Sequence, residues 1–159
     1  MKTLQKVILG FVLISAIVIS GCNKDNDDNP TTPSNGSLTL KHGGSAWSAS
    51  MSVQAVNTNG VLNITGSDSK ANQAAITIFQ PNGAGTYTIG TLSNPGNSGR
   101  WTQGINQTDT YTASSVLGTG EITITELTAT KAKGSFFFTA YNTDQNTVQV
   151  TEGKFDVKF

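Results

Sequence analysis

Few side chains in this chain could carry out catalysis. It contains one histidine, His42, and one cysteine, Cys22. A Ser-His-Asp triad needs a histidine base next to a serine nucleophile, and no serine here stands in a nucleophile-elbow context. Zinc sites use three or four histidine, cysteine or carboxylate ligands. We therefore expect no catalytic triad, no metal site and no cofactor, and we interpret His42 as a histidine of a surface turn.

Paired carboxylates offer a second kind of catalysis. Glycoside hydrolysis needs two carboxyl groups, about 5 Å or about 6.5–9.5 Å apart. Charged residues that alternate with apolar ones along a strand usually form its solvated face, so we expect the chain not to be an enzyme. The alternative is a glycan-degrading enzyme, which predicts that two of four acidic residues converge in one cleft: Glu121, Glu126, Glu152 and Asp156.

Aromatic rings could instead bind a ligand by stacking. Trp47 and Trp101 lie beside predicted loops, and Tyr111 lies on a predicted strand. Binding sites combine such rings with a few polar groups, so we select Trp101, Trp47 and Tyr111 as candidate ligand-binding residues. The alternative for both tryptophans is a position in the core, and for Trp47 the neighbours Ala46 and Ala49 favour it.

The N-terminus has the pattern of an export signal. Two lysines precede an apolar run of about thirteen residues that ends at Ile19. Because a membrane-spanning helix needs about twenty apolar residues, we expect segment 1–21 to be removed. Ser20, Gly21 and Cys22 resemble the end of the lipobox of bacterial lipoproteins, which implies that Cys22 carries lipid and anchors the protein in a membrane. The alternative is a retained signal anchor in which Cys22 is a small buried residue.

Residues 22–37 predict a disordered tether because they offer almost nothing apolar to bury. Asp25, Asp27 and Asp28 follow Cys22 closely. This run resembles the surface-export signal of Bacteroidota lipoproteins, which implies a place on the outer face of the outer membrane. The alternative is a solvated linker without an address, which leaves the periplasmic face open. A calcium loop would need glycine and glutamate where Pro30 and Gly36 stand, so we reject it.

The remainder of the chain is electrically balanced, with seven basic and seven acidic residues from residue 38 onward. Nucleic-acid-binding domains usually carry a basic patch, and none is visible here. We therefore expect no nucleic-acid partner.

Alternation with a period of two predicts strands almost throughout. Asn59-Gly60 between two alternating runs indicates a β-hairpin. We predict one all-β domain over residues 38–159, an antiparallel β-sandwich or flattened barrel of about nine or ten strands, preceded by a signal helix and the tether. The predicted strands are 52–56, 61–65, 75–79, 86–89, 100–102, 111–113, 121–125, 134–141, 147–151 and 154–159.

Two irregularities carry further predictions. The apolar positions change parity between Val150 and Phe155, so we expect a β-bulge at Glu152–Gly153. In the run 136–138, the middle ring Phe137 must face away from its two neighbours. Either both faces of this strand are covered, which we favour, or Phe137 lies at a partner surface.

Five short segments carry a family resemblance. They are Ser45-Ala46-Trp47-Ser48-Ala49, Gly85-Thr86-Tyr87-Thr88-Ile89, Gly120-Glu121-Ile122-Thr123-Ile124-Thr125, Gly134-Ser135-Phe136-Phe137-Phe138 and Val150-Thr151-Glu152-Gly153-Lys154-Phe155. In this order they resemble a family of small uncharacterised lipoproteins of Bacteroidota. The match lies over most of residues 40–159, and the resemblance implies an all-β fold without assigning any activity.

Together these patterns favour a lipid-anchored lipoprotein of the outer membrane, facing the cell exterior, whose β domain binds a glycan or another envelope protein. A second hypothesis is a lipocalin-like barrel that carries a small apolar ligand. It predicts an internal cavity lined by four apolar side chains: Phe136, Phe138, Ile122 and Ile124.

Overall fold

The computed structural model describes residues 36–93 and 95–159, which form antiparallel β-strands and one short 3₁₀ helix, η1 (Gln107–Asp109). The predicted all-β class is therefore confirmed. The strands are β1 (Gly36–His42), β2 (Ser45–Ser48), β3 (Ser52–Thr58), β4 (Val61–Ser67), β5 (Gln73–Phe79), β6 (Gly85–Ile89), β7 (Ser98–Thr102), β8 (Thr110–Ala113), β9 (Thr119–Leu127), β10 (Lys131–Tyr141) and β11 (Thr147–Lys158).

Most predictions for the N-terminal segment lie outside the described residues. They concern the signal 1–21, the lipid acceptor Cys22 and the export residues Asp25, Asp27 and Asp28. The predicted tether 22–37 overlaps the domain by two residues, because β1 begins at Gly36 and pairs there with Val157 of β11. Backbone pairing needs no apolar side chain, so composition alone placed this boundary too late. No helix among the described residues is long and apolar enough to cross a membrane.

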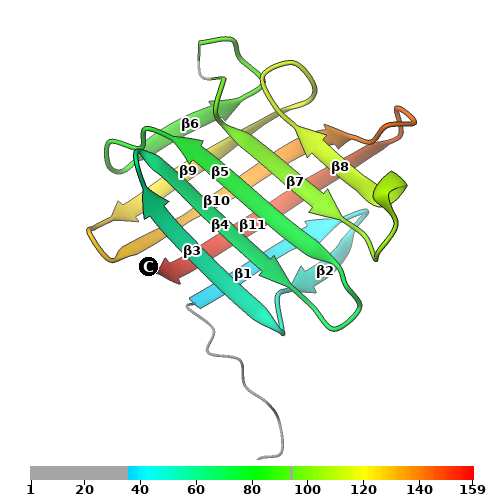
Figure 1. Ribbon diagram of the computed structural model, residues 1–159, viewed down its shortest axis with the longest axis horizontal. Helices are drawn as coiled ribbons and strands as arrows, with labels where there is room; N and C mark the ends of the chain where they lie inside the picture. The colour runs from blue at the N-terminus through cyan, green and yellow to red at the C-terminus, as the bar shows by residue number, and fades with distance from the viewer. Residues whose placement is uncertain (1–35, 94) are drawn as a thin grey trace, which may run out of the picture.

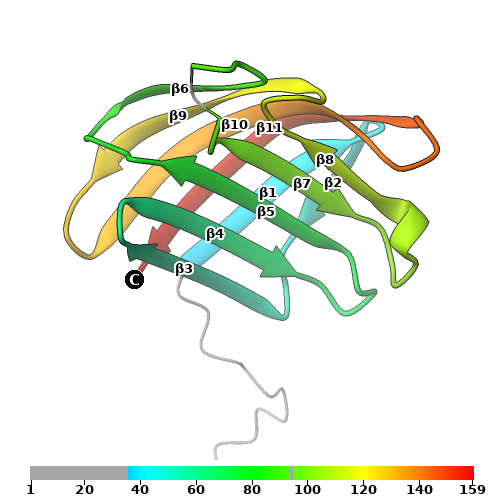
Figure 2. The same cartoon turned by 45° about the horizontal axis from the view of Figure 1, so that its top comes forward.

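All strands belong to one curled sheet that folds over itself as a half-barrel. In Figure 1, β3, β4, β5, β7 and β8 form a front layer that crosses a back layer of β6, β9, β10, β11 and β1. The two layers join where Tyr141 of β10 pairs with Thr112 of β8. Figure 2 shows the curl of the sheet from one layer into the other. The back layer runs in the order β2-β1-β11-β10-β9-β6.

The strand count differs from the prediction for identifiable reasons. The two predicted segments at the end of the chain are one strand, β11, while β1 and β2 were not predicted as separate strands. The hairpin prediction is confirmed: β3 and β4 pair, and the turn residues Asn59 and Gly60 have φ of 53° and 74°. Two residues with positive φ match the right-handed twist of the flanking strands.

The predicted β-bulge is also confirmed. Along β10 the partners on β11 jump from Gly153 to Val150 while β10 advances by two residues, from Phe136 to Phe138. The same extra residue appears in the pairing with β1. Glu152 takes up the irregularity with φ of 50°. The bulge lets β11 keep apolar side chains inward on both sides of the parity change.

The core lies between the two layers and is filled by inward side chains of alternating positions. Phe136 and Phe138 are buried and stack with their ring centroids 6.1 Å apart. Phe137 faces outward and is 52% exposed, so the favoured prediction that both faces of this strand are covered is wrong. The reason is that no element packs on the outer side of β10 among the described residues.

Candidate functional site

The tryptophans selected as ligand-binding candidates lie in the core. Trp101 is 0% exposed and Trp47 is 8% exposed, and their rings meet edge to face at 5.2 Å. Trp47 donates its Nε1–H to Asp68 Oδ2 at 2.7 Å. The burial of both rings agrees with the alternative of core positions, although Trp47 also contributes to the lining of a groove at β1, β2 and β11.

Tyr111 and His42 lie beside Trp101. Tyr111 pairs with Trp101 across β7 and β8 and packs, half-buried, against the core. His42 ends β1 rather than lying in the following turn, and its ring centroid is 4.5 Å from that of Trp101. Desolvation by burial lowers the pKa of His42 below its usual 6.5. No carboxylate of the described residues forms an ion pair with this ring, so nothing orients it as a triad base.

The outward side chains of the back layer form a different surface. Register aligns one residue from each of its six strands, and five of these six residues carry a hydroxyl group. We call this line the polar row. It consists of Ser48 (β2), Thr39 (β1), Lys154 (β11), Ser135 (β10), Thr123 (β9) and Thr86 (β6).

Phe137 stands in the adjacent line of residues. Its cross-strand partner on β9 is Glu121, and on its other side the bulge of β11 places Glu152. A half-exposed phenyl ring between carboxylates is unusual on a sheet face that is otherwise polar. An aromatic face surrounded by hydrogen-bonding groups is the arrangement that binds molecules with both an apolar face and hydroxyl groups.

Two grooves meet on this surface. One, of about 270 Å³, is lined by residues of β9, β10 and β11, including Phe137, Glu121 and Ser135. The other, of about 380 Å³, is lined by residues of β1, β2 and β11, including Thr39 and Ser48. Glu152 and Lys154 line both, so the two grooves adjoin at β11.

The charges of this site are unevenly paired. Lys41 Nζ lies 2.9 Å from Glu152 Oε1, so these two charges neutralise each other. Lys154 has no ion-pair partner among the described residues. Glu121 has no ion pair there either, although Thr123 Oγ1 donates a hydrogen bond to its Oε1 at 3.4 Å. Within the described part of the chain, the two grooves thus present Lys154 as a cation without an ion pair and Glu121 as a carboxylate without one.

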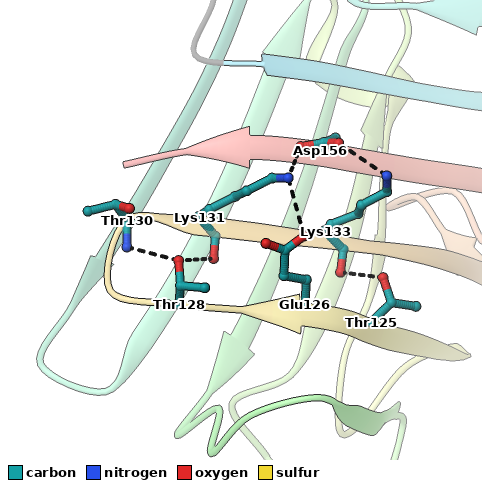
Figure 3. Close-up of polar contacts among 7 residues, drawn as sticks. All are labelled: Thr125, Glu126, Thr128, Thr130, Lys131, Lys133 and Asp156. Carbon is teal, nitrogen blue, oxygen red and sulfur yellow. Dashed lines mark hydrogen bonds and ion pairs between the residues drawn. The ribbon is translucent and has the colours of Figure 1, made fainter.

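The four acidic residues of the enzyme hypothesis divide into two pairs. Glu121 and Glu152 line the same groove, with Phe137 between them. Glu126 and Asp156 lie elsewhere on the sheet, where Lys131 Nζ is 3.2 Å from Glu126 and 3.4 Å from Asp156, as Figure 3 shows. Lys133 is 3.4 Å from the other oxygen of Asp156. The side chain of Glu152 is 63% exposed and held by Lys41, unlike the apolar enclosure that keeps a glycosidase acid protonated.

A lipocalin-like carrier would have an internal cavity lined by the four apolar residues named for it. Side chains fill the interior at that position. Ile122, Ile124, Phe136 and Phe138 are all buried in one cluster. The Phe138 ring lies so close to Gly99 that a Cβ there would approach it within 2.5 Å. No group of three or more potential metal ligands gathers among the residues that the structure describes.

Reasoning from the sequence missed the polar row, and it did not include Phe137 among the candidate ligand-binding residues. The parity of the run 136–138 did contain a signal, because one of its rings had to face outward. The polar row carried no such signal, because its residues lie in one line only after six strands have paired.

Comparison with known proteins adds a family but no activity. A family model described as a domain of unknown function, DUF6252, matches residues 34–157. No curated protein and no solved structure matches the chain.

Proposed function

Because this chain belongs to the DUF6252 family of domains of unknown function, we propose its role from its own residues. It is a lipid-anchored, non-catalytic protein of the bacterial cell surface that binds carbohydrate on the outer face of the back layer. The observation that carries this proposal is the half-exposed Phe137 in a groove rimmed by hydroxyl and carboxylate groups. The ring would stack on a sugar face while Glu121, Thr123 and Ser135 bond its hydroxyls.

A glycan array with the full chain in detergent tests binding, and titration calorimetry on a hit tests the site. We expect Phe137→Ala to weaken binding about tenfold, which corresponds to about 1.4 kcal/mol. The matched control is Phe79→Ala, because Phe79 is a similarly exposed ring (44%) on the front layer. Capture of an envelope protein without any glycan hit, or equal losses in both variants, would overturn the carbohydrate assignment.

The sequence before residue 36 supports a lipid anchor and a signal for export to the cell surface. We propose that Cys22 bears the lipid and that Asp25, Asp27 and Asp28 send the protein to the outer face of the outer membrane, as in the Bacteroidota lipoproteins it resembles. Protease treatment of intact cells should cleave the wild type, and replacing the three aspartates with alanine should protect it. If wild type is cleaved only in lysed cells, the domain faces the periplasm.

A further inference from the structure

We infer that the ligand is an extended acidic polysaccharide that lies across the strands, rather than a single sugar or a chain end. This inference rests on the proposed function and names its substrate class. It follows from the adjacency of the two grooves, from the length of the polar row and from the position of Lys154.

The grooves define the direction of the ligand. They lie side by side, with Glu152 and Lys154 in the wall of each, and together they reach from Ser48 on β2 to Thr123 on β9. A ligand that fills both therefore crosses β1, β11 and β10 instead of following one strand.

The polar row defines the length. Its six strands leave five gaps of about 4.8 Å each, so the row extends for about 24 Å. Hydroxyl groups stand on five of these strands, on both sides of Lys154. A row of this length with donors and acceptors throughout suits a linear hydroxyl-rich polymer, whereas a single sugar would occupy only the part near Phe137.

The charges define the chemical class. Glu152, at the bulge, pairs with Lys41, and Lys154 has no ion pair with any residue that the structure describes, at the place where the two grooves meet. An acidic sugar at the middle of the ligand would pair with Lys154. Glu121 beside Phe137 would repel a carboxylate, so the sugar on the ring is a neutral one. The ligand is therefore a polymer that contains neutral sugars next to its acidic sugars.

The test compares two ladders of oligosaccharides, from disaccharide to octasaccharide, on the full chain. One ladder carries uronic acids and neutral sugars in turn, and the other has the same lengths without acids. We expect affinity to rise with length until the chain spans the row, and the acidic ladder to bind about fivefold tighter at low salt. Added salt should remove most of that preference because it screens exposed charges.

Two variants assign these effects to residues. Lys154→Gln should abolish the preference for the acidic ladder, whereas Lys158→Gln, on the same strand but outside both grooves, should leave it intact. Ser48→Ala with Thr39→Val should weaken only the longer oligosaccharides. If sugars bind through Phe137 but with affinity independent of length and charge, this inference is wrong and the proposed function stands. If no sugar binds at all, both are wrong.

Discussion

The ring of Phe136 lies so close to Gly153 that a Cβ atom at position 153 would come within 2.5 Å of its Cε2. The two residues are register partners on β10 and β11, at the last pair before the bulge. The glycine therefore lets a core ring lie against the backbone of β11. Its two neighbours in the chain, Glu152 and Lys154, line both grooves, so core packing and the candidate site are linked at this point.

Gly153→Ala should destabilise the protein by about 1–3 kcal/mol, because the new methyl group overpacks the core against Phe136. Urea unfolding of the full chain measures the change. Gly85→Ala is the matched control, since Gly85 also lies in a strand and a Cβ there would meet nothing within 4 Å. Equal stability of the two variants would contradict the packing argument.

The hydrogen bond from Trp47 to Asp68 should appear as a coupling energy in a double-mutant cycle. With Trp47→Phe and Asp68→Ala, we expect a coupling of about 1.5 kcal/mol, typical of a hydrogen bond to a charged group. Trp101→Phe provides the comparison, because Trp101 Nε1 is buried without an acceptor among the described residues. Its cycle with Asp68→Ala should give a coupling of less than about 0.5 kcal/mol.

Asp68 should make the stability depend on pH in the acid range. Burial raises its pKa, but hydrogen bonds from Asn72, Trp47 and Lys70 together outweigh burial, so the pKa lies below the ordinary 3.8. The stabilisation is therefore complete well above pH 3.8 and is lost as the pH falls through the lowered folded-state pKa. As the pH is lowered through this range, the free energy of unfolding should decline less steeply in Asp68→Asn than in the wild type. The matched control is Asp109→Asn, because the Asp109 carboxylate accepts a hydrogen bond from Asn106 and none from Trp47.

His42 should oppose folding when it takes up a proton. Burial against Trp101 lowers its pKa below 6.5, so between the two pKa values the unfolded chain binds more protons than the folded one. Its contribution is complete above pH 6.5 and is lost as the pH falls through the folded-state pKa. Because the chain has one histidine, a proton NMR titration follows this residue unambiguously. A titration midpoint at or above 6.5 would contradict this prediction. In His42→Asn, the free energy of unfolding should no longer show the part of its pH dependence that His42 contributes.

Much of the fold could be predicted because the signals are local. Alternation over residues 52–65 indicates two strands, and Asn59-Gly60 indicates the turn between them, all within a short stretch of chain. The bulge at Glu152 could be predicted for the same reason, since a change of parity along one strand requires an extra residue. The strands β1 and β2 are harder to predict, because they are short and contain few apolar residues, and β1 is held in place by its pairing with the distant β11.

The candidate site could be predicted less well. Trp47 and Trp101 were selected because they adjoin loops, but adjacency in sequence does not say on which side of a sheet a ring will lie. The run 136–138 allows either a covered Phe137 or a Phe137 at a partner surface, and no local pattern distinguishes the two. Only the arrangement of the layers decided between these interpretations.

By itself, the sequence determined the all-β class, the hairpin, the bulge and the balanced charge of this protein, because each depends on neighbouring residues or on composition. The tertiary structure decided which residues act together. Thr39 and Lys154 are far apart in the chain and become neighbours through the pairing of β1 with β11, while Ser135 and Thr123 join them through β10 and β9. Non-local strand pairing creates the polar row and the groove at Phe137, and no local pattern specifies that pairing.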